Sequence, residues 1–257
     1  MNRNHLKHVF GRCLMFALML SLLASAALAE SGRGSLEDRF ANVPRVEYHG
    51  ETYYLRSRTS ALMVTGVLPD ETSGLPCTDF VAVFVIDDNR NLITPLYIDG
   101  WTIVEVEGNS IPLRDVYALG EDPTENCLRL QAAVQGLLGG ELIANYMAID
   151  LEGIKVIAEF SALEGSTRER LHLLRLAMQS IPSKQLNQMY GAISAYLTTD
   201  MKSGEVMRVL DKTDRYEVAD TVDLPTLPVE EEGDPLVPDR SQILGIVLDV
   251  FFDTVLF

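Results

Sequence analysis

The sequence predicts an α/β fold in which a mixed sheet lies between two helical layers, an α/β/α sandwich. Residues 78–101 contain two apolar runs rich in β-branched residues, separated by the polar turn 88–91, a pattern that is typical of a buried β-hairpin. Residues 128–138 have helical spacing of apolar positions, and two glycines end that segment. Strands and helices alternate without a strict βαβ rhythm, which favours a mixed sheet over a wholly parallel one.

The other elements are predicted from apolar periodicity and turn residues. They are strands at about 46–56, 60–68, 143–150 and 221–224, a short strand and turn at 101–112, helices at 151–159, 166–181, 183–196 and 203–210, and a closing helix at 239–252. Residues 230–234 form an acidic stretch, which predicts a solvated loop.

Composition limits the class of protein. The chain has 257 residues, of which 47% are hydrophobic, and this is enough for one large domain or two small ones. Its formal net charge is −16, and because residues 1–29 hold three basic residues and no acidic one, the remainder carries −19. Such a charge repels nucleic acid phosphates, so we expect no nucleic acid partner.

The N-terminal segment has the pattern of an export signal. Basic residues lead into the apolar run 13–23, and the small-x-small motif at 27–29 follows. The run is short for a spanning helix of ~20 residues. We therefore predict a cleaved signal peptide at 1–29, a flexible tether at 30–45 and one domain at 46–257; an uncleaved membrane anchor is the alternative. Either way, the domain is expected to be extracytoplasmic.

Two cysteines remain after the leader, Cys77 and Cys127. An even pair in an exported chain makes a disulfide between them a candidate. Two separately buried thiols are the alternative, because cysteine is among the most buried residue types.

Three motifs occur in a characteristic order. Cys-Thr-Asp-Phe lies at 77–80, Leu-Tyr-Ile-Asp-Gly at 96–100 and Val-Tyr-Ala-Leu-Gly at 116–120. They resemble the Arg-Ser-Asp-Thr, Ile-Pro-Arg-Asp-Thr and Ala-Tyr-Ala-Tyr-Gly motifs of the LytR-CpsA-Psr (LCP) family, also called the cell envelope-related transcriptional attenuator domain. Members of that family have an α/β/α sandwich and join undecaprenyl-pyrophosphate-linked glycopolymers to peptidoglycan outside the cell. The likeness extends over roughly 46–257.

The resemblance implies a set of site residues. Those implied for catalysis are Asp79, Asp99, Arg114 and Arg170, with Asp79 as the candidate Mg²⁺ ligand. An antiparallel hairpin would bring Asp79 and Asp99 to one edge of the sheet. Tyr97, Trp101 and Tyr117 are the residues implied for substrate binding. The alternatives are ordinary structural roles: turn amides as the partners of the two aspartates, a surface ion pair for Arg170, and a place in the core for the aromatic rings.

The sequence departs from the family where the family has arginines. Cys77 and Ile98 replace two of them, and the helix-start pattern keeps only Arg170. Losing one transition-state donor costs about 10²–10³ in rate. We therefore expect a binding or accessory module for a polyprenyl-linked glycopolymer or another lipid. An active Mg²⁺-dependent phosphotransferase with a rearranged site is the alternative, and a structural envelope protein with a closed pocket is a third.

Overall fold

The structure is a computed structural model that describes residues 44–78, 80–160, 183–213, 215–228 and 236–254. The chain divides into two compact units, one made of Met1–Leu55 with Thr254–Phe257 and the other of Arg56–Asp253. The described part of the first unit is an antiparallel hairpin of β1 (Arg45–Tyr48) and β2 (Glu51–Leu55). The leader, residues 30–43 of the predicted tether, the predicted helix at 166–181 and the acidic stretch at 230–234 lie outside the described residues, and the end of the predicted tether already belongs to β1.

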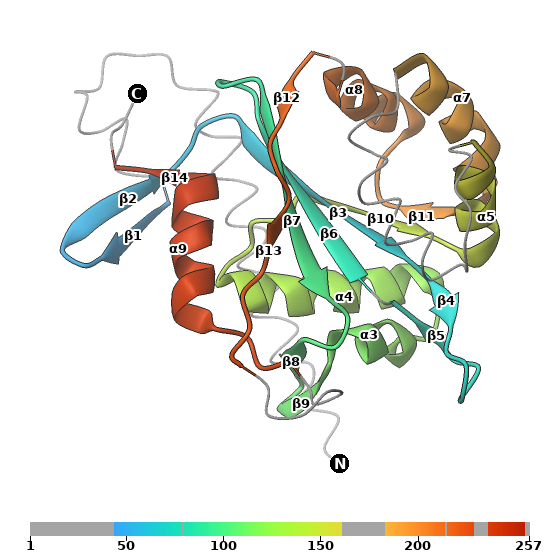
Figure 1. The fold of residues 1–257 in the computed structure, drawn as a ribbon, viewed down its shortest axis with the longest axis horizontal. Helices are drawn as coiled ribbons and strands as arrows, with labels where there is room; N and C mark the ends of the chain where they lie inside the picture. Colours follow the sequence, from blue (N-terminus) through green and yellow to red (C-terminus); the bar gives the residue numbers. More distant parts are fainter. Residues whose placement is uncertain (1–43, 79, 161–182, 214, 229–235, 255–257) are drawn as a thin grey trace, which may run out of the picture. The chain divides into compact units, whose positions relative to one another are not determined.

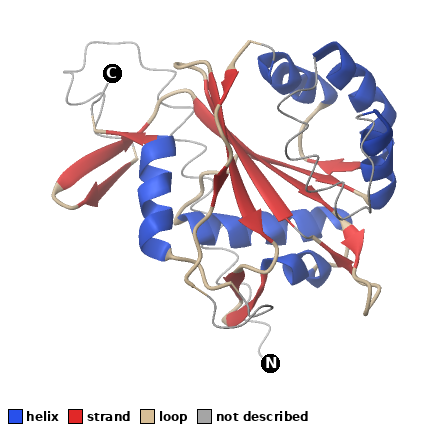
Figure 2. Ribbon diagram, viewed as in Figure 1, coloured by secondary structure: helices blue, strands red, loops and turns tan. Residues whose placement is uncertain are grey.

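The second unit is built on a mixed sheet, as predicted (Figures 1 and 2). Its strands are β3 (Thr59–Gly66), β6 (Phe80–Asp87), β7 (Leu92–Asp99), β10 (Asn145–Ile149), β11 (Leu197–Thr199), β12 (Glu217–Val218) and β13 (Val222–Asp223). The order is β11-β10-β3-β6-β7-β12, and β13 also pairs with β7. Pairs β3–β6, β6–β7 and β10–β11 are antiparallel, whereas β10–β3, β12–β7 and β13–β7 are parallel.

The predicted hairpin is the centre of this sheet. Asp87 closes its turn, because one carboxylate oxygen accepts hydrogen bonds from the backbone N–H groups of Asn89 and Arg90 at 2.9 and 3.1 Å. Phe80 pairs with Asp99 in the register, so the start of β6 and the end of β7 lie at one edge. This is the edge at which the motif residues were expected to meet.

One face of the sheet is covered by α4 (Pro123–Leu138) and α9 (Arg240–Phe251) (Figure 1). Helix α4 begins five residues earlier than predicted, because the Asp122 side chain accepts hydrogen bonds from two first-turn N–H groups and proline occupies the first position. Gly139, with φ of 84°, ends it as expected. Leu130 and Val134 of α4 are fully buried.

The other face is covered by α5 (Leu151–Phe160), α7 (Ser183–Ile193) and α8 (Ser203–Thr213) (Figure 1). The sandwich predicted from the sequence is therefore confirmed. Within the described residues, no helix combines the length and apolar character that crossing a membrane requires.

Short elements complete the second unit. They are the hairpin of β4 (Leu68–Pro69) and β5 (Pro76–Cys77), the hairpin of β8 (Ile103–Val106) and β9 (Asn109–Pro112), the helical turns α3 (Leu113–Val116), η1 (Tyr117–Leu119) and η2 (Ser194–Tyr196), and the strand β14 (Phe252–Asp253). Both hairpins lie at the edge where β6 begins and β7 ends (Figure 1).

Candidate functional site

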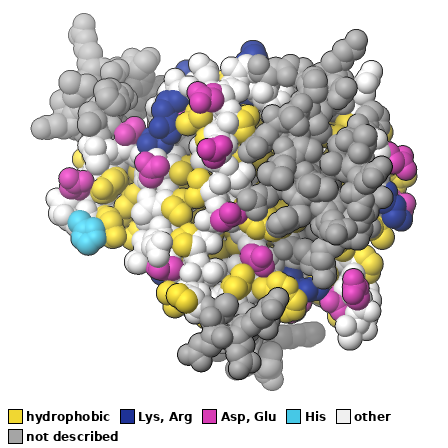
Figure 3. All heavy atoms as spheres, in the orientation of Figure 1, with side chains coloured by type: hydrophobic (Ala, Val, Ile, Leu, Met, Phe, Trp, Pro, Cys, Tyr) yellow, Lys and Arg dark blue, Asp and Glu magenta, His cyan; other side chains and the backbone are white. Residues whose placement is uncertain are grey.

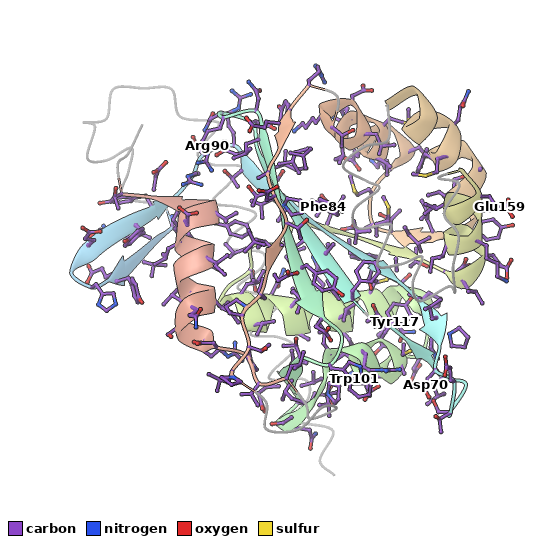
Figure 4. All side chains as sticks on the ribbon, in the orientation of Figure 1. Asp70, Phe84, Arg90, Trp101, Tyr117 and Glu159 are labelled. Carbon is purple, nitrogen blue, oxygen red and sulfur yellow. The ribbon has the colours of Figure 1, made fainter. Side chains whose placement is uncertain are left out.

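An apolar cavity of about 140 Å³ lies between the sheet and the layer of α5, α7 and α8. Its walls are hydrophobic side chains of both layers, including Val64, Ala82, Phe84 and Tyr97 of the sheet and Ile154 and Met189 of the helices. Phe84 marks the middle of the sheet wall in Figure 4.

The strand period explains why the cavity is apolar. Successive side chains of a strand point to opposite faces, so Phe80, Ala82 and Phe84 of β6 face the cavity. Val81 and Val83, the residues between them, are fully buried and do not line it. Because β6 is apolar from Phe80 to Ile86, both faces of the sheet are hydrophobic there and each can bury a helical layer.

The end of the cavity nearest the motif edge is lined by a compact hydrophobic cluster. Leu68 of β4 packs there with Phe80 and Tyr97, whose rings are stacked at 5.8 Å, and with Ile154 and Met189 of the helices. Tyr97 was predicted to bind substrate, and its position in the cavity wall is compatible with contact to an apolar ligand.

Two buried threonines supply polar groups at this end. Thr65, which lines the cavity, and Thr78 donate to the carbonyl oxygen of Phe80 at 2.8 and 2.7 Å. Their hydroxyl groups also contact each other. These polar groups are therefore satisfied within the protein.

Arg114 lies at the same edge and is held by protein groups. Its side chain is only 5% exposed, and Nη2 donates to Asp70 Oδ2 at 2.7 Å and to Cys77 Sγ at 3.3 Å. The guanidinium carbon is 4.5 Å from the centre of the Trp101 ring, within cation–π range. Asp70 and Trp101 lie at this end of the sheet in Figure 4. Arg114 thus ties two loops together.

Asp70 is itself fixed in a turn. Its Oδ1 accepts hydrogen bonds from the backbone N–H and hydroxyl of Ser73 and from the backbone N–H of Thr72. These bonds, and the charge of Arg114 to a smaller extent, lower the pKa of the Asp70 carboxyl. Asp70 is therefore anionic at neutral pH.

The structure gives Asp99 the role of a turn residue. Its Oδ1 accepts a hydrogen bond from the backbone N–H of Trp101 at 2.8 Å, which shapes the turn after β7. Trp101 itself is 48% exposed. Asp79 and Arg170, the other two predicted catalytic residues, lie outside the described residues.

A metal site is not assembled in the part of the chain that the structure describes. No three Asp, Glu, His or Cys side chains lie together there in an arrangement that could hold a cation. The candidate ligand Asp79 is not among these residues.

The candidate disulfide is not formed, and the alternative of two separately buried thiols is what the structure shows. Cys77 contacts Arg114, whereas Cys127 lies 4.0 Å from the hydroxyl of Tyr117 on the α4 side. Burial raises the pKa of Cys127 to about 11 and also raises the pKa of Tyr117. Tyr117, predicted to bind substrate, is 4% exposed and does not line the cavity.

Sequence reasoning missed Asp70 as the partner of Arg114. The run Asp-Glu-Thr-Ser at 70–73 has the signature of an Asx-turn, and that signal was available. The pairing itself joins residues 44 positions apart, and no local pattern reports such a contact.

The surface chemistry agrees with the composition. In Figure 3, acidic side chains are spread over the described part of the face, and the basic side chains described there form no continuous patch. A broad basic surface is the usual footprint of nucleic acid binding.

The fold is similar to that of several solved structures, although no protein-family model and no curated protein matches the sequence. Bacillus subtilis TagV is 15% identical, with a TM-score of 0.54 over 76% of this chain and 96% of TagV. Protein gbs0355 from Streptococcus agalactiae is 13% identical, with a TM-score of 0.57 over 78% of this chain and 91% of that protein. TagT bound to LI-WTA is 10% identical, with a TM-score of 0.56 over 76% of this chain and 90% of TagT. At these identities the likeness establishes a shared LCP-like fold.

Proposed function

We propose that this protein acts at the cell envelope as an LCP-like binding or accessory module for a polyprenyl-linked glycopolymer or a related lipid. The observation that carries the proposal is the apolar cavity between the sheet and the helical layer. Ligand sites are typically concave and mostly apolar, with a few polar groups at one end. Thr65 is a polar group of this kind, at the edge where Arg114 also lies.

The ligand class follows from the cavity and from the comparisons. Walls of branched aliphatic and aromatic side chains suit a hydrocarbon chain and offer few partners to a polar molecule. TagT, which shares the fold, has been solved bound to LI-WTA, and this supports a lipid-linked glycopolymer as the ligand here. The predicted export signal would place the domain on the side of the membrane where such polymers are assembled.

Binding without transfer is favoured by the charges at the edge. Cys77 and Ile98 are buried where the resembled family has arginines, and neither can neutralise a leaving phosphate. Arg114, the expected substitute, already donates to Asp70. A headgroup would therefore meet less available positive charge than phosphoryl transfer requires.

Calorimetric titration of the purified protein with farnesyl pyrophosphate tests the binding. Ala82→Leu places three extra carbon atoms in the cavity wall and should weaken binding about tenfold, since overpacking costs about 1–3 kcal/mol. Ala192→Leu makes the same change at an exposed site on α7 and should leave binding unchanged. No measurable binding, or equal binding by both variants, would contradict the proposed function.

Turnover separates this module from an active transferase. We expect no Mg²⁺-dependent release of glycopolymer from a pyrophosphate-linked lipid, with or without a peptidoglycan acceptor. Asp79→Ala and Asp99→Asn are the controls. Metal-dependent release that disappears in both variants would establish the transferase instead.

A further inference from the structure

The β4–β5 hairpin, residues 68–77, lies behind one end of the cavity wall, although its own residues do not line the cavity. At its base, Leu68 is buried against Phe80, Tyr97 and Ile154, whose side chains also line the cavity. At its tip, residues 71–75 are exposed to solvent. The hairpin has only one short pair of two-residue strands, so few backbone hydrogen bonds hold it in place.

Arg114 fastens this hairpin to the rest of the unit. Its Nη2 reaches Asp70, just after β4, and Cys77, at the end of β5, so one guanidinium bonds both arms of the hairpin. The Arg114 carbonyl oxygen also accepts a hydrogen bond from Thr78 N, directly after β5. The backbone N–H of Arg114 donates to the Gly100 carbonyl oxygen at 2.7 Å, which holds Arg114 to the turn after β7.

The cavity is too small for the ligand proposed above. A cavity of about 150 Å³ in another protein holds one benzene molecule, and this one measures about 140 Å³. A polyprenyl tail has many times that volume. Entry of such a tail therefore needs the site to open, and Leu68 at the base of the hairpin packs against three of the side chains that line its end.

We infer that the β4–β5 hairpin is a lid latched by the Asp70–Arg114 ion pair, and that an anionic phosphate headgroup releases it by taking Arg114 from Asp70. This inference rests on the proposed function, because it explains how the same cavity admits a long tail. Phosphate and carboxylate oxygens compete for the same guanidinium donors. Asp115, whose Oδ1 is 3.7 Å from Arg114 Nε, keeps a second carboxylate near the buried charge when the latch opens.

Asp70→Asn is the variant that opens the latch. It removes the charge but keeps the oxygen that accepts from Thr72 and Ser73, so the turn can persist. Asp253→Asn is the matched control, because Asp253 also pairs with a mostly covered arginine, Arg56, at 3.1 Å.

The first readout is the rate of farnesol association, followed in a stopped-flow instrument through Trp101, the single tryptophan of the chain. We expect Asp70→Asn to associate about tenfold faster, the change expected when a charge-assisted hydrogen bond is lost. Inorganic pyrophosphate should speed farnesol association with the unsubstituted protein and with Asp253→Asn. It should have little effect on association with Asp70→Asn. Equal rates in the two variants, or no response to pyrophosphate, would overturn the latch.

The second readout needs no ligand, so it separates the latch from the proposed function. The amides of Asp70 and Gly74 donate hydrogen bonds within the hairpin, to Leu75 and Asp70 respectively. Their hydrogen exchange should be about tenfold faster in Asp70→Asn than in Asp253→Asn. If farnesol does not bind but exchange rises as expected, the proposed function fails and the latch stands. Unchanged exchange removes the latch whatever farnesol does.

Discussion

Met189→Ala tests the cavity through both stability and binding. Met189 lies on α7, is 6% exposed and lines the cavity. The substitution removes three methylene-sized groups at about 0.8 kcal/mol each, a transfer cost of about 2.4 kcal/mol. The enlarged empty volume adds to this cost. We therefore expect a loss of ~3–4 kcal/mol in the free energy of unfolding, within the range of about 2–5 kcal/mol measured for such truncations.

Met207→Ala is the matched control. Met207 lies on the neighbouring helix α8, is partly exposed and does not line the cavity. Its truncation should cost about 1 kcal/mol or less, because part of the side chain already contacts water. Urea unfolding gives both values, provided that the slope of free energy against urea is the same for the two variants.

Farnesol then distinguishes a ligand cavity from an ordinary packing defect. A ligand that binds only the folded state raises the free energy of unfolding by an amount that grows with the logarithm of its affinity. Since Met189→Ala has more room, farnesol should stabilise it more than it stabilises Met207→Ala. Equal losses in the two variants, or equal stabilisation by farnesol, would refute our placement of the cavity.

Leu130→Ala, at a fully buried position of α4, should cost about 2–5 kcal/mol, whereas Leu128→Ala, at a half-exposed one, should cost less than about 0.5 kcal/mol; similar losses in urea unfolding would contradict the packing of α4. Hydrogen bonds from the Gln242 backbone N–H and the Ser241 hydroxyl lower the pKa of the Asp239 carboxyl. Asp239→Ala should therefore lower the thermal midpoint at neutral pH, and the deficit should vanish as the pH falls through the lowered pKa; a constant deficit would argue against the cap. Burial raises the pKa of Cys127 to about 11, so iodoacetamide at about pH 8 should label it only in urea, without reductant; labelling of the folded protein would contradict its burial.

The central hairpin was predictable because its signals are local. A polar turn between two β-branched apolar runs is typical of a hairpin and of few other structures. Asp87 closes that turn by accepting hydrogen bonds from backbone N–H groups two and three positions further along the chain. The start of α4 was harder to place. Its apolar periodicity begins near Leu128, but the helix begins at Pro123, because Asp122 supplies the cap before any buried position occurs.

The candidate site was predictable only in part. The motifs pointed to one edge of the sheet, and Asp99, Trp101 and Arg114 do lie near one another there. The role of Arg114 was not predictable, because Asp70 approaches it from a separate loop. The separation of Cys77 from Cys127 was equally invisible in the sequence, since a count of cysteines carries no information on distance.

The alternation of apolar strands and helices was sufficient to determine the α/β/α sandwich, because periodicity dictates which faces must be buried. That cysteine and isoleucine stand at 77 and 98, where the resembled family has arginines, is likewise read from the sequence alone. Only the tertiary structure decided what surrounds Arg114 and where an unfilled volume remains. Both depend on the packing of side chains from distant segments, and such packing is determined when the layers come together.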